Sequence, residues 1–286
     1  MPPTLERTTT PLASGLAVGE GPRWHGGRLW FSDMHGRQVM TLDPAGRLED
    51  VVRVEARPSG LGWLPDGRLL VVSMEDRKLL RLAGGALETH ADLSALASHE
   101  INDLVVASDG CAYVSQFGFA FGKGGEYRKT EILLVTAQGQ ARVAATDLAF
   151  PNGMVITPDG GTLIVGESFA ARLTAFERAP DGTLGRRRLF AKLAEGTTAD
   201  GICLDAEGCV WVASPPSKEC LRVREGGEVV ERVRTETLSI ACMLGGEDRR
   251  TLYVLTSEAL DPAECERLRS ARVESVRVDV PGAGWP

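Results

Sequence analysis

One short pattern recurs six times along the chain, and this recurrence constrains the fold more than any other feature. A turn precedes a short β-rich strand in HGGRLWFSD (from His25), PDGRLLVVS (Pro65), SDGCAYVSQ (Ser108), PDGGTLIVG (Pro158), AEGCVWVAS (Ala206) and EDRRTLYVLT (Glu247). The copies lie roughly 40 to 50 residues apart, a spacing typical of propellers and solenoids. Because the segments are short, rich in β-branched and aromatic residues, and bounded by Gly, Asp and Pro, helical solenoids are excluded.

Each copy divides into four predicted strands, which in the fourth copy are residues 153–157, 162–167, 172–177 and 187–192. Four-stranded units repeated radially are the blades of a propeller. The sequence therefore predicts an all-β, six-bladed β-propeller with four-stranded antiparallel blades, as one domain over residues 1–286. The last copy lacks one strand, and we expect the N-terminal stretch before Leu16 to supply it, closing the ring and covering its open sheet edges.

Composition excludes several classes of function. The net charge of −7, with acids and bases interspersed, argues against a nucleic-acid partner. No run approaches the ~18 apolar residues of a membrane span, and the first residues lack the features of a signal peptide, so we expect a cytoplasmic protein. The six cysteines contain no CxxC pair and are interpreted as reduced, mostly buried thiols.

Aligning the repeats on their turns brings one position of each blade into register. Seven residues before the turn acid, at the start of the strand nearest the axis, the six blades carry Glu20, Ser59, Asn102, Asn152, Asp200 and Ala241, the first blade having a turn one residue shorter. Four of the six side chains offer carboxylate or amide oxygens, which are the donors that calcium prefers. With no His or Cys in the ring, zinc is less favoured.

A structural interpretation of the same residues is also open. Asn152-Gly153 and Asp200-Gly201 are common turn pairs, and Glu20 followed by Gly-Pro is compatible with a solvated loop. Three independent blades with acceptors in one register favour the metal site over these alternatives.

The loops after the second strands should surround the mouth of this site. The longest are residues 116–130 and 257–271, and long loops in a compact fold often form lids or substrate walls, although they can also simply pack on a neighbour. The aromatic and apolar residues expected near the mouth, from several of the loops after the second strands, predict a ligand less polar than a free sugar acid; these are Met34, Phe117, Phe119, Phe121 and Phe169. His35 and His99 lie on loops at the same end and are candidates for the rim.

Three stretches resemble the signatures of a known family. GEGPRW (from Gly19), FPNGM (from Phe150) and ADGICLD (from Ala199) are similar to those of the SMP-30/gluconolactonase family, also called regucalcin-like, and the similarity extends over essentially the whole chain. The resemblance implies a six-bladed propeller with one divalent metal, and lactone hydrolysis in many members. By resemblance, Glu20, Asn152 and Asp200 match the three metal ligands, and Asn102 matches an asparagine that lies beside the metal and helps to bind substrate.

Two positions depart from the sugar-lactonase pattern. Glu100 stands where many such members have an arginine that holds sugar hydroxyls, and Ser115-Gln116-Phe117 replaces a Gly-Thr-Met stretch. We therefore take Glu100 and Phe117, with Asn102, as candidate substrate-binding residues of an altered wall, and do not expect gluconolactone itself as the substrate.

The expected chemistry is metal-assisted opening of a lactone or related ester. The cation, expected to be Ca²⁺ with Zn²⁺, Mn²⁺, Mg²⁺ and Fe²⁺ left open, would polarise the carbonyl. By resemblance to the family, Asp200 is the carboxylate near the metal that would take the proton from the attacking water. Asp103 is a second candidate for the base. Two alternatives stay open: an organophosphate hydrolase on the same metal, and a non-catalytic propeller that binds a metabolite.

Overall fold

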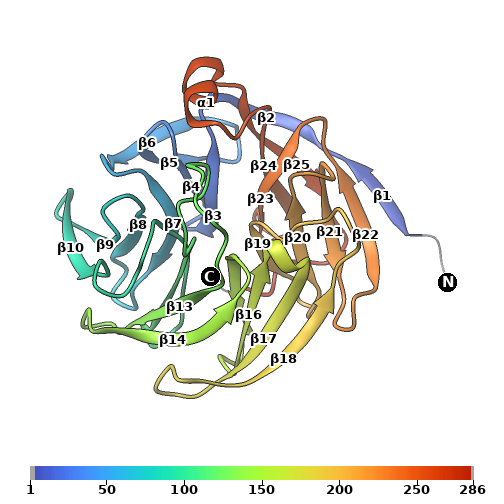
Figure 1. The fold of residues 1–286 in the computed structure, drawn as a ribbon. Helices are drawn as coiled ribbons and strands as arrows, with labels where there is room; N and C mark the ends of the chain where they lie inside the picture. Colours follow the sequence, from blue (N-terminus) through green and yellow to red (C-terminus); the bar gives the residue numbers. More distant parts are fainter. Residues whose placement is uncertain (1–3, 285–286) are drawn as a thin grey trace.

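Six β-sheets stand around a common axis in the computed structural model, which describes residues 4–284 (Figure 1). The first two blades consist of β3 (Gly19–His25), β4 (Arg28–Asp33), β5 (Gln38–Leu42), β6 (Leu48–Arg53), β7 (Pro58–Trp63), β8 (Leu69–Ser73), β9 (Lys78–Ala83) and β10 (Ala86–Asp92). The third and fourth consist of β11 (Ile101–Val106), β12 (Ala112–Gln116), β13 (Thr130–Val135), β14 (Ala141–Leu148), β15 (Pro151–Ile156), β16 (Thr162–Glu167), β17 (Arg172–Arg178) and β18 (Leu184–Lys192). The predicted six-bladed propeller is confirmed.

The last two blades contain the ends of the chain. The fifth has β19 (Ile202–Leu204), β20 (Val210–Ser214), β21 (Glu219–Val223) and β22 (Val229–Arg234), and the sixth has β23 (Leu238–Gly245), β24 (Thr251–Ser257) and β25 (Ala271–Arg277). The N-terminal β2 (Thr10–Leu16) pairs antiparallel with β25 and completes the sixth blade, as predicted. The ring is thus closed by pairing the start of the chain with its end.

The fifth blade differs from the expected four-stranded unit. β1 (Leu5–Thr8) adds a fifth, parallel strand at the outer edge of β22. Arg7 fixes it there, because its guanidinium reaches Glu231 and Asp279, each at 2.6 Å. The extra strand covers an edge that would otherwise be open to pairing with another chain.

Burial changes from the axis outward and explains the composition of the strands. All six residues of β11 and of β15, nearest the axis, are buried. In the outer β18, by contrast, Gly185 to Leu189 are exposed. Inner strands are covered on both faces by the neighbouring blades and therefore carry continuous apolar runs, whereas outer strands need only one apolar face.

Two features lie outside the blades. A short helix, α1 (Pro262–Leu268), interrupts the connection between β24 and β25 and begins with Asp261 accepting a hydrogen bond from the Glu264 amide at 3.1 Å. The sequence pattern did not predict it. At the far end of the axis, Gly282 pairs with Asp205. No helix within residues 4–284 has the length and apolar character needed to cross a bilayer.

Candidate metal centre and substrate pocket

The aligned positions of four successive blades meet in one chain of hydrogen bonds at the axis. The Ser59 hydroxyl donates to Oδ1 of Asn102 at 3.2 Å, Nδ2 of Asn102 donates to Oδ1 of Asn152 at 2.8 Å, and Nδ2 of Asn152 donates to Oδ1 of Asp200 at 2.5 Å. These partners are separated by 43, 50 and 48 residues in the chain. The register of the repeats therefore places these side chains together as expected.

The turn interpretation of the two Asx-Gly pairs is wrong. Asn152 and Gly153 lie inside β15, and neither Gly153 nor Gly201 has a positive φ. Both glycines are required by close packing instead. A Cβ on Gly153 would lie 2.5 Å from the carbonyl oxygen of Asp200, and one on Gly201 would lie 2.3 Å from the Cβ of Ala241. The missing side chains let adjacent blades approach closely enough for their polar residues to touch.

Glu20 enters the same site from β3 and is not a solvated loop residue. It is 8% exposed, and its Oε2 accepts a hydrogen bond from the Gly21 amide at 3.0 Å. Burial, together with the charges of Asp200 and Asp103, raises the pKa of Glu20 well above its usual value. Burial and the charge of Asp103 likewise raise the pKa of Asp200, although this side chain keeps part of its surface open. The charge of Arg23 offsets the rise in the pKa of Glu20 only in part.

Asp103 pairs with Arg23, and both side chains are almost fully buried. An Nη of Arg23 lies 3.4 Å from Oδ1 of Asp103, and the guanidinium also donates to the carbonyl oxygens of Pro22 and Leu104. Burial raises the pKa of Asp103, and Arg23 only partly offsets it. When ionised, three carboxylates (Glu20, Asp103, Asp200) and one guanidinium leave an excess of two negative charges, which is the charge that one divalent cation neutralises.

The donor set suits a hard cation rather than a soft one. Within residues 4–284, no group of three His, Cys, Asp or Glu side chains is arranged to hold a metal. The predicted set of Glu20, Asn152 and Asp200 has only two carboxylates and is completed by an amide oxygen, and such mixed oxygen sets fit calcium.

The six cysteines are free thiols, five of them buried, as expected.

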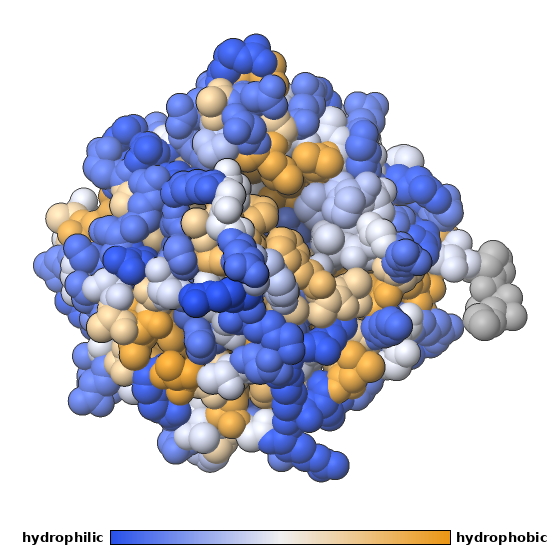
Figure 2. All heavy atoms as spheres, viewed as in Figure 1, coloured by the Kyte–Doolittle hydropathy of each residue, from blue (hydrophilic) through white to orange (hydrophobic). Residues whose placement is uncertain are grey.

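A cavity of about 280 Å³ opens above these residues. Its floor is polar and consists of Glu20, Asn102, Asn152, Ser168, Thr198 and Asp200. Its wall is apolar and consists of Val18, Met34, Phe117, Phe121, Phe150, Phe169, Pro215, Pro216, Ile240 and Leu260. Figure 2 shows hydrophobic surface beside a hollow near the centre of this face. A concave apolar site with a few converging polar groups is the usual form of a small-molecule site.

Three phenylalanine rings form a continuous stack in the wall. Phe150 lies between Phe117, with ring centroids 5.0 Å apart, and Phe169, with centroids 4.6 Å apart, and the planes differ by only 11° and 10°. Phe121 leans on Phe150 at 5.0 Å. Phe119 packs behind them and does not line the cavity. Phe150 was not among the expected wall residues, although FPNGM places it two positions before Asn152.

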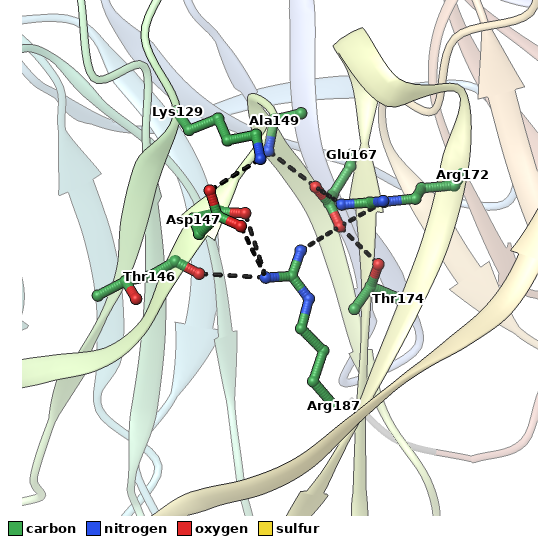
Figure 3. A network of polar contacts seen from close by, with 8 residues as sticks. All are labelled: Lys129, Thr146, Asp147, Ala149, Glu167, Arg172, Thr174 and Arg187. Atoms are coloured by element: carbon green, nitrogen blue, oxygen red, sulfur yellow. Dashed lines mark hydrogen bonds and ion pairs between the residues drawn. The ribbon is translucent and has the colours of Figure 1, made fainter.

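A buried carboxylate holds Phe150 in place. Glu167, with a fully buried side chain, accepts hydrogen bonds from the Ala149 amide, from Thr174, and from the guanidinium groups of Arg172 and Arg187 (Figure 3). Burial alone would raise the pKa of Glu167, but its hydrogen bonds with Arg172, Ala149 and Thr174 outweigh burial and lower the pKa. The anchored segment lets Phe150 keep a φ of 59°, a conformation that non-glycine residues seldom adopt.

Ser168, which follows Glu167 in the sequence, connects the buried Glu167 to the site. The Ser168 hydroxyl donates to the carbonyl oxygen of Ala199 at 2.6 Å and lies 3.4 Å from Nδ2 of Asn152. Ser168 was not a predicted site residue, and no spacing rule would have found it.

Other expected residues lie outside the cavity. The Glu100 carboxylate is 2.6 Å from Nζ of Lys123 and 3.9 Å from Arg57, and Glu100 does not line the cavity. His35 is 5% exposed and, like His99, does not line the cavity. Asn102 and Phe117 do line it.

Six blades with oxygen donors gathered at one end of the axis, beneath an apolar cavity, define a propeller with a small-molecule site. Residues 18–258 match the family described as the SMP-30/gluconolactonase/LRE-like region. The chain belongs to this family, as its three signature stretches indicated.

Known proteins similar to the chain agree with this assignment. A 6-deoxy-6-sulfogluconolactonase of Pseudomonas putida is 27% identical over 277 residues, which cover 94% of each chain. The crystal structure of a calcium-binding regucalcin from Agrobacterium tumefaciens superposes with a TM-score of 0.80 at 22% identity, covering 99% of each chain. A gluconolactonase from Xanthomonas campestris gives a TM-score of 0.76 at 22% identity, covering 96% of this chain and 89% of its own. The two structural similarities establish the fold.

Proposed function

We propose that this chain is a hydrolase that opens a lactone or a related activated ester with one divalent cation held by Glu20, Asn152 and Asp200. The observation that carries the proposal is the convergence of two carboxylates and an amide, from three different blades, on the floor of an accessible cavity, where burial raises the pKa of both carboxyl groups. The lactonase named among the relatives supports the reaction class, and the calcium-binding regucalcin supports Ca²⁺ as the ion.

A bound divalent cation would supply Lewis acidity, polarising the carbonyl group of the substrate and lowering the pKa of a water molecule. The protein residues have separate tasks around it. Asn102 lines the floor and retains one Nδ2 hydrogen beyond its bond to Asn152, so it can donate to an oxygen of the substrate. The apolar wall excludes water from the reacting bond, which strengthens these polar interactions.

Asp200 is the proposed general base. Asn152 occupies its Oδ1, which leaves Oδ2 to accept the proton of the attacking water. Asp103 is paired with Arg23 and does not line the cavity, which favours Asp200 over Asp103 in this role. The proton would pass from Asp200 to the alkoxide oxygen released when the ring opens.

The test is lactone hydrolysis by chelator-treated protein to which calcium, magnesium, manganese, iron(II) or zinc is restored. We expect activity to return with at least one ion in the wild type and in Asp50→Asn, an exposed control, and to stay at least about a hundredfold lower in Asp200→Asn. Failure of every lactone with every ion in folded protein would contradict the proposal. A faster reaction on a phosphotriester than on any lactone would favour the organophosphate alternative.

A further inference from the structure

The cavity offers few partners to a polyhydroxylated ring. Both Nδ2 hydrogens of Asn152 are directed to Asp200 and Ser168, one of Asn102 is directed to Asn152, and the Ser168 hydroxyl donates to Ala199. Within residues 4–284, the only hydrogen-bond donors that the lining side chains keep spare are one hydrogen of Asn102 and the hydroxyl of Thr198. Among the same side chains, the spare acceptors are the oxygens of Glu20 and Asp200 assigned to the cation and the base. A sugar lactone with a hydroxyl on most carbons would therefore lose hydrogen bonds to water without replacing them.

The rest of the apolar wall does not supply the missing partners. It includes Pro215 and Pro216, which have no backbone N–H to donate, together with Met34 and Leu260. Two nearby polar residues are committed elsewhere. Glu100 is bound by Lys123, and Gln116 is fully buried and bonded to the Ser98 amide and to Glu131.

The aromatic side of the cavity is left partly uncovered. Phe169 is 48% exposed and Phe121 is 45% exposed, even though both belong to a packed cluster of rings. Phe169 continues the parallel stack from Phe117 through Phe150, so the cluster presents flat, preordered aromatic surface beside the floor. Such surface favours a planar apolar group, because aromatic groups gain from stacked and edge-to-face contacts beyond simple burial.

We infer that the substrate is a lactone or cyclic ester bearing an aryl or similar flat apolar substituent, with the substituent against Phe117, Phe121, Phe150 and Phe169 and the carbonyl at the polar floor. This inference rests on the proposed function for the reaction, but it concerns the ligand and can be tested without turnover.

The first experiment compares kcat/KM for δ-lactones that carry a phenyl group, a methyl group or several hydroxyl groups. The phenyl lactone should exceed the polyhydroxylated lactone by at least about tenfold. In Phe169→Ala the preference for phenyl over methyl should fall by about tenfold. Leu189→Ala, which removes an exposed apolar side chain from β18, away from the cavity, should leave this preference unchanged. A preference for the hydroxylated lactone, or an unchanged preference in Phe169→Ala, would overturn the inference.

The second experiment measures calorimetric binding of the matching δ-lactams, which resist hydrolysis. The phenyl lactam should bind at least about tenfold more tightly than the hydroxylated lactam, and Phe169→Ala should remove this difference. If the phenyl lactam binds in this way but no lactone is hydrolysed, the proposed reaction fails and the inference about the ligand stands. If lactones are hydrolysed but the lactams bind equally, the inference fails and the proposed reaction stands.

Discussion

Nδ2 of Asn152 donates a hydrogen bond to Oδ1 of Asp200 across 2.5 Å, although the two residues are 48 positions apart and come from different blades. The contact is possible because Gly153 and Gly201 let the inner strands approach. It joins an amide to a carboxylate whose charge lacks a full counterpart, since Arg23 is already paired with Asp103.

Replacing Asp200 by Asn should stabilise the metal-free protein while removing its response to metal. The substitution removes one of the buried, mutually repelling carboxylates, and we expect a gain of about 1 kcal/mol in the free energy of unfolding. Thermal unfolding with a chelator and with calcium measures both effects. The wild type and Asp50→Asn should melt higher with calcium than with chelator; a calcium-induced rise that persists in Asp200→Asn would contradict Asp200 as a ligand.

The stability of the metal-free protein should fall as pH rises from about 7 to about 8, above the range in which His25, His35 and His90, whose pKa burial lowers, affect it. Burial raises the pKa of Glu20, Asp103 and Asp200 in the folded state, so the folded protein holds protons that the unfolded chain has already released. Stability from such groups is complete below their unfolded pKa and is lost as pH passes the folded pKa. Urea denaturation at a series of pH values tests this. Calcium should flatten the decline, and metal-free stability that increases with pH over this range would be inconsistent with the site.

Replacing Glu167 by Gln should destabilise the protein and disturb the wall of the cavity. The change leaves Arg172 and Arg187 without their buried counter-charge, and we expect a loss of about 3 kcal/mol in the free energy of unfolding. Glu177→Gln, which removes an exposed partner of Arg186, should cost less than about 1 kcal/mol. Urea denaturation of the two variants gives the comparison. Equal losses would mean that the Glu167 cluster contributes no more than a surface pair.

The two N-terminal strands should differ in importance. Deleting residues 1–16 removes β2 and exposes an edge of β25, so we expect aggregation or loss of cooperative unfolding. Deleting residues 1–8 removes only β1, which adds to a blade that already has four strands, and should preserve a cooperative transition. Light scattering and thermal unfolding of both deletions test the closure of the ring. A soluble, cooperative 17–286 fragment would contradict it.

The repeats predicted the fold closely because each blade is a local unit with its own turn and apolar strands. The expected strand 162–167 coincides with β16, whereas 187–192 begins three residues after the start of β18, whose exposed first half carries no apolar pattern. Neither β1 nor α1 was predicted. A parallel edge strand of four residues and a helix of seven residues depend on contacts with distant parts of the chain, so neither produces a periodic pattern in the sequence.

The site was predictable where it followed the register and not where it depended on packing. Glu20, Asn102, Asn152 and Asp200 share a repeat position, and the structure brings them to one cavity. The hydrogen bond from the Ala149 amide to Glu167 positions Phe150, and the hydrogen bond from the Ser168 hydroxyl to the Ala199 carbonyl oxygen positions Ser168. The spacing of the repeats does not reveal either contact. Glu100 lies two residues before Asn102, but its carboxylate contacts Lys123, which is 23 residues further along the chain in a loop. The residues next to Glu100 in the sequence do not predict this contact.

Calorimetric titration of chelator-treated protein with calcium tests the central claim most directly. A cation site formed by Glu20, Asn152 and Asp200 predicts one calcium ion per chain in the wild type and no binding at this site in Asp200→Asn. Protons should be released on binding, because burial raises the pKa of Glu20 and Asp200 in the metal-free protein. If the folded wild type binds none of calcium, magnesium, manganese, iron(II) and zinc, or binds calcium equally well after Asp200→Asn, then Glu20, Asn152 and Asp200 do not form a metal centre.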